Sequence, residues 1–152
     1  MAQSLARVYI HLIFHIKSTS PKIEEKDWER VHSYIGQLVN ITGCQVVKVG
    51  GVEDHVHILL RLSKDVSIAH VTQEVKRNSS RWIKSIAPCY RLFEWQSGYG
   101  AFSVSQSLVE RTEQYIIRQK NHHQKHGFEE EYLSFLKVYG VDYDEKYLFS
   151  EI

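Results

Sequence analysis

The chain has 152 residues, 43% of them hydrophobic and 24% charged, which is enough for one well-filled core and excludes both a disordered chain and two ordinary domains. We therefore expect a single domain over residues 1–152. The longest apolar stretches are strand-sized, so no membrane helix is predicted. Two cysteines exclude a disulfide framework, and a reducing, cytoplasmic location fits best.

The predicted elements begin with a strand over residues 8–16, where apolar residues alternate strictly, and a helix over about 24–42. Two β-rich runs, 44–49 and 52–62, surround Gly50-Gly51, a pair that favours a tight hairpin. Helical spacing returns at about 67–84 and a fourth strand is predicted within 99–104. Two helices follow, one from Ser107 to Gly127 and one from Glu129 to Tyr139.

This order of strand, helix, strand, strand, helix and strand, followed by two helices, matches the split βαβ plan. We therefore predict a mixed α/β (α+β) class with a ferredoxin-like fold, in which an antiparallel sheet has its helices packed on one face.

His55 and His57 flank Val56 near the start of the second hairpin strand. In an extended strand both imidazoles emerge on one side of the sheet and Val56 points to the other. Two adjacent neutral imidazoles can hold one divalent metal ion. The alternative is a pair of half-buried side chains on a polar face. Asp54, just before them, either orients an imidazole or ends the hairpin turn.

Tyr115 and Gln119 are four residues apart in the helix predicted after Ser107, so they share a face. In one interpretation Tyr115 is a core residue and Gln119 is solvated. In the other, Tyr115 is a nucleophile that a nearby metal assists, because a phenol with a pKa near 10 is scarcely ionised at neutral pH.

The net charge of +1 conceals an uneven distribution of charge. The second predicted helix carries a run of cations without an acidic residue among them: Lys76, Arg77, Arg81 and Lys84. They either form a solvated face of the helix or contact phosphates.

Acidic residues collect after residue 128, and we expect this carboxy-terminal part to face away from any nucleic acid. Three histidines lie near the end of the helix predicted from Ser107 to Gly127: His122, His123 and His126. Positively charged side chains are favoured near the carboxyl end of a helix, which explains them without a function, and a DNA contact is left open.

These residues resemble a known family, the single-tyrosine transposases of small bacterial insertion sequences, within the HUH endonuclease superfamily. Asp54-His55-Val56-His57-Ile58-Leu59 is similar to the family's His-hydrophobic-His motif. Tyr115-Ile116-Ile117-Arg118-Gln119 is similar to its tyrosine helix. The resemblance covers nearly the whole chain and includes the segment Trp95-Gln96-Ser97-Gly98-Tyr99.

The resemblance implies that His55, His57 and Gln119 bind Mg²⁺ or Mn²⁺ and that Tyr115 is the nucleophile. The implied function is that of a DNA transposase, which cleaves and rejoins single-stranded DNA at insertion-sequence ends through a 5′-phosphotyrosine intermediate. The resemblance further implies single-stranded DNA with hairpin ends as substrate and a homodimer as the assembly. The phosphate contacts it implies are Lys76, Arg77, Arg81 and Lys84.

A non-catalytic alternative stays open, because a ferredoxin-like sheet is also the plan of RNA-recognition modules. Such a single-stranded nucleic-acid-binding module needs stacking aromatic residues on its central strands and no metal. A member retained by its host and an active mobile element have the same predicted chemistry, so the sequence does not separate them.

Overall fold

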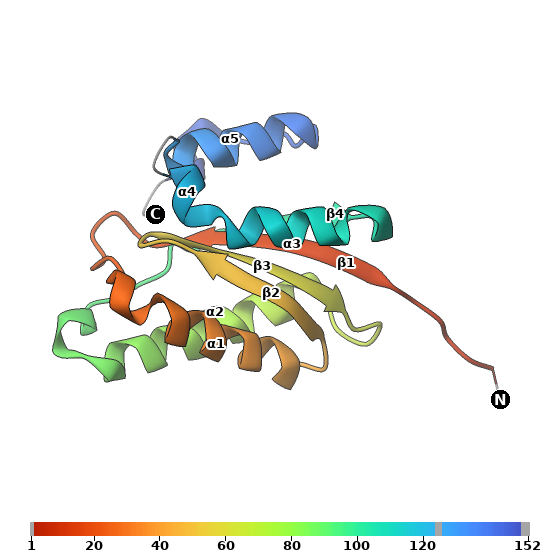
Figure 1. Cartoon of the computed structure of the whole chain (residues 1–152), viewed down its shortest axis with the longest axis horizontal. Coiled ribbons are helices and arrows are strands. Elements are labelled where there is room, and N and C mark those ends of the chain that lie inside the picture. The colour runs from red at the N-terminus through yellow and green to blue at the C-terminus, as the bar shows by residue number, and fades with distance from the viewer. Residues whose placement is uncertain (1, 124–125, 150–152) are drawn as a thin grey trace.

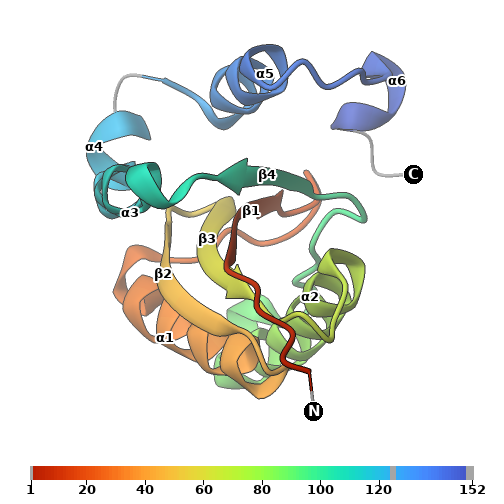
Figure 2. The same cartoon turned by 90° about the vertical axis from the view of Figure 1, so that its right-hand side faces the viewer.

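A computed structural model describes residues 2–123 and 126–149. Its centre is an antiparallel sheet with the strand order β2-β3-β1-β4 (Figures 1 and 2). The strands are β1 (Val8–His15), β2 (Gln45–Gly51), β3 (His55–Leu62) and β4 (Gly100–Val104). Helix α1 (Glu25–Ile41) connects β1 to β2, and α2 (Ile68–Ile86) leads from β3 toward β4. The helices after β4 are α3 (Val109–Ile117), α4 (Gln119–His123), α5 (Phe128–Val138) and α6 (Glu145–Leu148).

The split βαβ order and the antiparallel sheet confirm the predicted fold class. Short 3₁₀ turns stand at Pro88–Tyr90 and Gln106–Leu108. Within the described part of the chain, no helix combines the length and the apolar character needed to cross a membrane.

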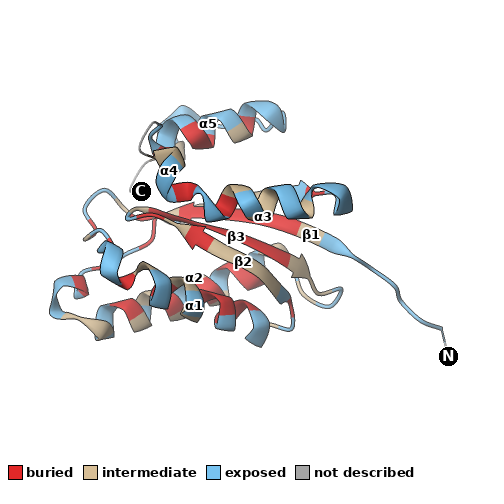
Figure 3. Ribbon diagram, in the orientation of Figure 1, coloured by how far each residue is buried: buried red, intermediate tan, exposed pale blue. Residues whose placement is uncertain are grey.

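Different helices cover the two faces of the sheet (Figure 2). Leu12 and Ile58 point to one face and belong to the main core, which α1 and α2 complete. Ile13 points to the other face, where it packs with Tyr132 of α5, and Ile116 of α3 packs against the same side of the sheet. Figure 3 shows buried residues along the strands and on the helix sides that face them. The expectation of helices on one face thus holds for α1 and α2, whereas α3 and α5 use a second apolar stripe to cover the opposite face.

Two glycines let the helices of this second face come close to the edges of the sheet. A Cβ atom on Gly50 of β2 would lie 2.7 Å from the backbone oxygen of Ile116 in α3. A Cβ atom on Gly100 of β4 would lie 2.7 Å from the ring of Tyr132 in α5. β2 and β4 are the two edge strands. A glycine, which has no side chain, therefore lets α3 pack closely on one edge and α5 on the other.

The helix predicted from Ser107 to Gly127 is interrupted. A 3₁₀ turn precedes α3, and Arg118, with φ −90° and ψ 14°, separates α3 from α4. The amide of Arg118 still donates to the carbonyl of Gln114. The chain then turns from the axis of α3 toward α5 (Figure 1).

A buried hydrogen-bonded pair ties the start of α1 to the turn after α2. Tyr90 Oη donates to Asp27 Oδ2 at 2.5 Å and accepts from the amide of Glu24 at 3.0 Å. Arg30 donates to the other carboxylate oxygen of Asp27. The hydrogen bond from Tyr90 holds the pKa of Asp27 below its ordinary value, and burial raises the pKa of Tyr90 to about 12. At neutral pH the pair is therefore a carboxylate and a phenol.

Candidate metal centre

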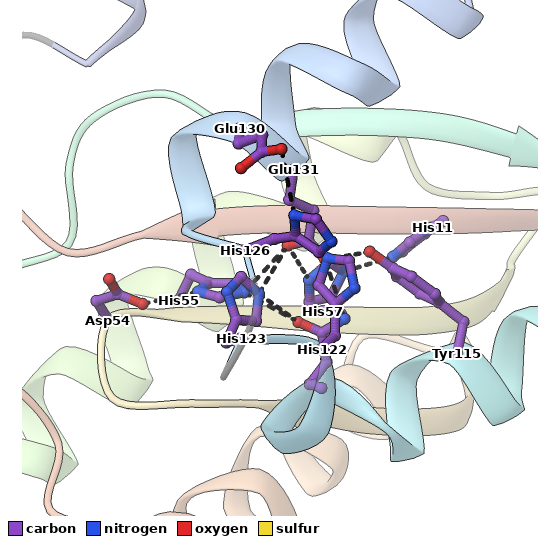
Figure 4. A network of polar contacts seen from close by, with 11 residues as sticks. His11, Asp54, His55, His57, Tyr115, His122, His123, His126, Glu130 and Glu131 are labelled. Atoms are coloured by element: carbon purple, nitrogen blue, oxygen red, sulfur yellow. Dashed lines mark hydrogen bonds and ion pairs between the residues drawn. The ribbon is translucent and has the colours of Figure 1, made fainter.

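The two histidines of β3 lie on the face of the sheet covered by α3 and α5, as their spacing predicts, and both are fully buried. Their Nδ1 atoms are occupied by neighbours (Figure 4). His55 Nδ1 lies 2.8 Å from Asp54 Oδ1, and His57 Nδ1 lies 2.8 Å from Nε2 of His11, a buried residue of β1. These contacts fix both rings with Nε2 directed at the same space. Asp54 therefore orients an imidazole, which was one of its two predicted roles.

The interrupted tyrosine helix brings three more side chains to this space. Tyr115 comes from α3, and its ring centroid lies 5.8 Å from that of His57. Gln119 begins α4 and is buried; its Oε1 lies 3.1 Å from His55 Nε2 and 3.0 Å from Nε2 of His123. The predicted group of His55, His57, Gln119 and Tyr115 thus lies together, and His123 joins it.

Glu131 of α5 occupies the middle of the cluster, with only 4% of its surface exposed. Its Oε1 lies 3.0 Å from His57 Nε2, 3.1 Å from His123 Nε2 and 3.3 Å from His55 Nε2. Tyr115 Oη donates a short hydrogen bond to the other oxygen, Oε2, which also accepts from Gln119 Nε2 at 3.1 Å. One carboxylate therefore links the tyrosine to all three imidazoles (Figure 4).

The carboxylate and the imidazoles set each other's charge. Burial alone would raise the pKa of Glu131, but hydrogen bonds from His123, His55 and His57 outweigh it and hold that pKa well below its ordinary value. Burial works against a charged His55, yet Asp54 and Glu131 raise its pKa to about 9. Burial lowers the pKa of His57 to about 4. Without a cation, the cluster holds a carboxylate and a protonated His55 at neutral pH.

Tyr115 is neutral in this arrangement. Burial raises the pKa of its phenol, and the negative charge and hydrogen bond of Glu131 raise it further. A positive charge added to the cluster acts in the opposite direction, because it favours the ionised form of a nearby acid.

The donor set fits a divalent cation. Nitrogen atoms of His55, His57 and His123 and a carboxylate oxygen of Glu131 all lie within 4.8 Å of one another. Imidazole nitrogens are ligands of first-row transition metals, and carboxylate and amide oxygens also suit Mn²⁺ and Mg²⁺. We therefore regard these four residues, with Gln119 beside them, as a candidate metal centre.

Two members of the cluster, His123 and Glu131, were not predicted from the sequence. His123 lies four residues after Gln119, so it continues the spacing of Tyr115 and Gln119, a signal that was present. Its interpretation as a cation at a helix end was incomplete. The expectation that the acidic carboxy-terminal part faces away is wrong for Glu131. The available signal was a carboxylate on the apolar stripe of α5, whose buried residues include Phe128 and Tyr132.

The cations predicted to contact phosphates lie elsewhere, on α2, which covers the opposite face of the sheet (Figure 2). Lys76 Nζ donates to the carbonyls of Gln96 and Gly98, and burial lowers its pKa to about 8. Arg77 pairs with Glu74 at 2.6 Å. Arg81 and Lys84 are exposed. The fold does not bring the four cations to the tyrosine, so any phosphate they contact lies away from it.

The fold and this cluster define a class of protein: a ferredoxin-like sheet with a histidine pair on a central strand and a tyrosine on a helix that faces it. The chain belongs to the family described as Transposase IS200 like, whose model matches residues 4–119. It is thus a member of a family of DNA-processing enzymes. The matched region ends at Gln119, so His123 and Glu131 lie beyond it.

The solved structures similar to the chain include the following two. One is a protein of Deinococcus radiodurans R1 assigned as a transposase, with a TM-score of 0.60 and 20% identity, covering 78% of this chain and 98% of that chain. The other is a REP-associated tyrosine transposase bound to a REP hairpin, with a TM-score of 0.58 and 10% identity, covering 81% of this chain and 74% of that chain. At these identities the likeness concerns the fold. No curated protein matches the chain.

Proposed function

We propose that the protein cleaves and rejoins single-stranded DNA at insertion-sequence ends by metal-assisted transesterification through a 5′-phosphotyrosine. The observation that carries this proposal is the convergence of Tyr115 Oη with a buried set of metal-ligand atoms. Membership of the transposase family supports DNA as the substrate.

In the proposed reaction Tyr115 Oη attacks the scissile phosphorus, and the bond from phosphorus to the 3′-oxygen breaks. The leaving 3′-oxygen takes up a proton. Glu131 Oε2 accepts the hydrogen bond of Tyr115 and orients the phenol, and Gln119 holds that carboxylate from its other side. The phenolic proton is released to solvent. A divalent cation bound by the cluster would supply Lewis-acid polarisation of the phosphate and favour the ionised phenol. Attack by the 3′-hydroxyl of another strand reverses the step and joins that strand.

Hairpin ends on the DNA strand belong to the proposal, and the similar fold of a protein bound to a REP hairpin supports them. The homodimer implied by the resemblance stays a prediction. Within the single chain, Tyr115 contacts Glu131.

The test is to incubate the protein with labelled single strands of the DNA that flanks its gene, in Mn²⁺ or Mg²⁺. We expect a covalent adduct that survives denaturing electrophoresis. Tyr115→Phe and chelator should each abolish it, while Tyr143→Phe, which alters an exposed tyrosine, should leave it unchanged.

Tight binding of these strands without any adduct, in either metal, would favour the non-catalytic binding module. An adduct that persists in Tyr115→Phe would assign the nucleophile to another residue.

A further inference from the structure

A hollow of about 460 Å³ lies beside Tyr115. Tyr115 borders both this hollow and the candidate metal centre. The other side chains around it include Arg111, Arg118, His122 and His126. The ring of His122 contacts that of Tyr115. The surface next to the proposed nucleophile is therefore rich in nitrogen donors.

The cations of this hollow follow from the spacing of the chain. Arg111, Tyr115 and Arg118 are separated by four and three positions, which places them along one face of α3 and the residue that ends it. His122 follows in α4, and its ring centroid lies 5.6 Å from that of Tyr115. Arg111 and Arg118 thus stand about one turn before and after Tyr115. The acidic residues of α3, Glu110 and Glu113, fall outside this stripe, so they do not neutralise it.

The two guanidinium groups are free to bind an anion. Both arginines are exposed, and neither forms an ion pair with a carboxylate of residues 2–123 or 126–149. This differs from Arg30 and Arg77, each of which pairs with an acid three residues earlier. His122 Nε2 is buried and has no hydrogen-bond partner among the residues that the structure describes, although Glu131 Oε2 lies 3.3 Å from it.

We propose that Arg111, Arg118 and His122 form a phosphate subsite that holds the backbone of the single strand next to the bond attacked by Tyr115. The subsite rests on the proposed function, because it positions that substrate. Arginine matches phosphate geometry with two parallel hydrogen bonds, and backbone contacts of this kind fix the register of a nucleic acid without reading its bases. The predicted cations of α2 lie on the opposite face of the sheet, so they do not serve this part of the strand.

The first experiment measures the salt dependence of binding to a fluorescent oligothymidylate for Arg111→Gln/Arg118→Gln. Each lost phosphate contact on a single strand lowers the slope of log K against log salt by about 0.7, so we expect a slope smaller by about 1.4. Arg7→Gln/Arg91→Gln removes the same charge at two exposed positions away from the hollow and should keep the slope. Mn²⁺ affinity should be unchanged in both variants.

The second experiment locates the subsite on the substrate. Once the cleaved bond has been mapped from the covalent adduct, the neighbouring phosphodiester is replaced by an uncharged methylphosphonate. This change should slow adduct formation by the unmodified protein. It should have no further effect on Arg111→Gln/Arg118→Gln, whose adduct formation is already slow.

The outcomes separate the subsite from the function on which it rests. If the unmodified protein forms the adduct and the arginine variant matches its control in slope and in adduct rate, the subsite is overturned and the proposed function stands. If the unmodified protein forms no adduct, the proposed function is overturned. The phosphate subsite is then overturned too, because it is defined by the bond that Tyr115 attacks.

Discussion

Glu131 is the residue on which the site depends most. It is a buried carboxylate that contacts three imidazoles through one oxygen and the tyrosine through the other. Without a cation its negative charge is balanced by the protonated His55. Since the same charge raises the pKa of Tyr115, this arrangement keeps the phenol of the proposed nucleophile in its neutral form.

If Glu131 is a metal ligand, Glu131→Gln should weaken Mn²⁺ binding by tenfold or more, because it removes the carboxylate from the cluster. Loss of a residue that only supports a metal ligand already lowers metal affinity by about 10- to 100-fold. Isothermal titration calorimetry measures this affinity. Glu130→Gln is the matched control, since Glu130 is exposed on the same helix and pairs with His126. Equal Mn²⁺ affinity in both variants would remove Glu131 from the metal centre.

The phenol of Tyr90 stabilises the fold through Asp27, and we expect Tyr90→Phe to lower the free energy of unfolding at pH 7 by about 1–3 kcal/mol. The folded-state pKa of Asp27 is depressed, so its contribution is present above its unfolded pKa of about 3.9 and is lost as the pH falls through the folded value. The difference in free energy of unfolding between the unmodified protein and Tyr90→Phe should therefore become smaller below about pH 4. Urea unfolding at several pH values measures this difference. A difference that stays constant down to pH 2 would contradict this account.

At the level of residues, local patterns predicted part of the site. Alternation along β3 placed His55 and His57 on one face, and helical spacing placed Tyr115 and Gln119 on another. Their proximity depends on how α3 packs on the sheet, which no local pattern contains. Glu131 was missed for the same reason, because its contact with His57 joins residues 74 positions apart. The break at Arg118, which aims Gln119 inward, had no sequence signal that we recognised.

At the level of elements, Gly50 fixes how the tyrosine helix meets the sheet. A Cβ atom on Gly50 would lie 2.7 Å from the backbone oxygen of Ile116, which adjoins Tyr115. The position of Tyr115, the proposed nucleophile, relative to β3 thus depends on the close packing at Gly50, which lies at the end of β2 that precedes the hairpin turn.

We expect Gly50→Ala to destabilise the fold by about 1–3 kcal/mol, the usual cost of overpacking, and to slow adduct formation in the protein that remains folded. Gly36→Ala is the control. Its new methyl group would lie 3.6 Å from a methyl group of Val46, and replacing a helical glycine gains up to about 1 kcal/mol. Thermal unfolding and the adduct assay measure both effects. An unchanged adduct rate in Gly50→Ala would show that the helix tolerates displacement.

The sequence predicted the order of the elements well and their ends less well. The alternation of β1 and the apolar stripes of α1 and α2 are strong local signals, and all three elements were found. The helix after Ser107 was predicted as continuous because the helical spacing of Tyr115 and Gln119 runs across Arg118 and the next stop signal is Gly127. Tertiary contacts of Gln119 and His123 with Glu131 accompany the break, and these lie outside any local window.

On the scale of the whole molecule, the sheet separates two surfaces. Helices α3 and α5, which border the candidate metal centre, lie on one side, and α2, which carries the predicted cations, lies on the other (Figure 2). If α2 binds DNA, it contacts phosphates remote from the cleaved bond, such as those of a hairpin.

Arg81→Gln/Lys84→Gln should therefore weaken binding of a hairpin-containing strand and lower its salt dependence, yet leave the rate of adduct formation at saturating strand unchanged. Lys22→Gln/Lys26→Gln, which removes the same charge before and within the first turn of α1, is the control. Affinity and salt slope come from fluorescence anisotropy. Values that match the control would exclude α2 from the DNA-binding surface.

The cluster joins parts of the chain that are far apart in sequence: His11 meets His57, 46 residues away, and His55 meets Gln119, 64 residues away. An unfolded chain cannot hold these groups together, so a cation that binds only the folded form acts as a cross-link between the sheet and the carboxy-terminal helices. At a concentration one hundred times its dissociation constant it adds about 2.7 kcal/mol to stability. We therefore expect Mn²⁺ to protect α5 from proteases and its amides from hydrogen exchange, and chelation to make this helix the first segment that is cut.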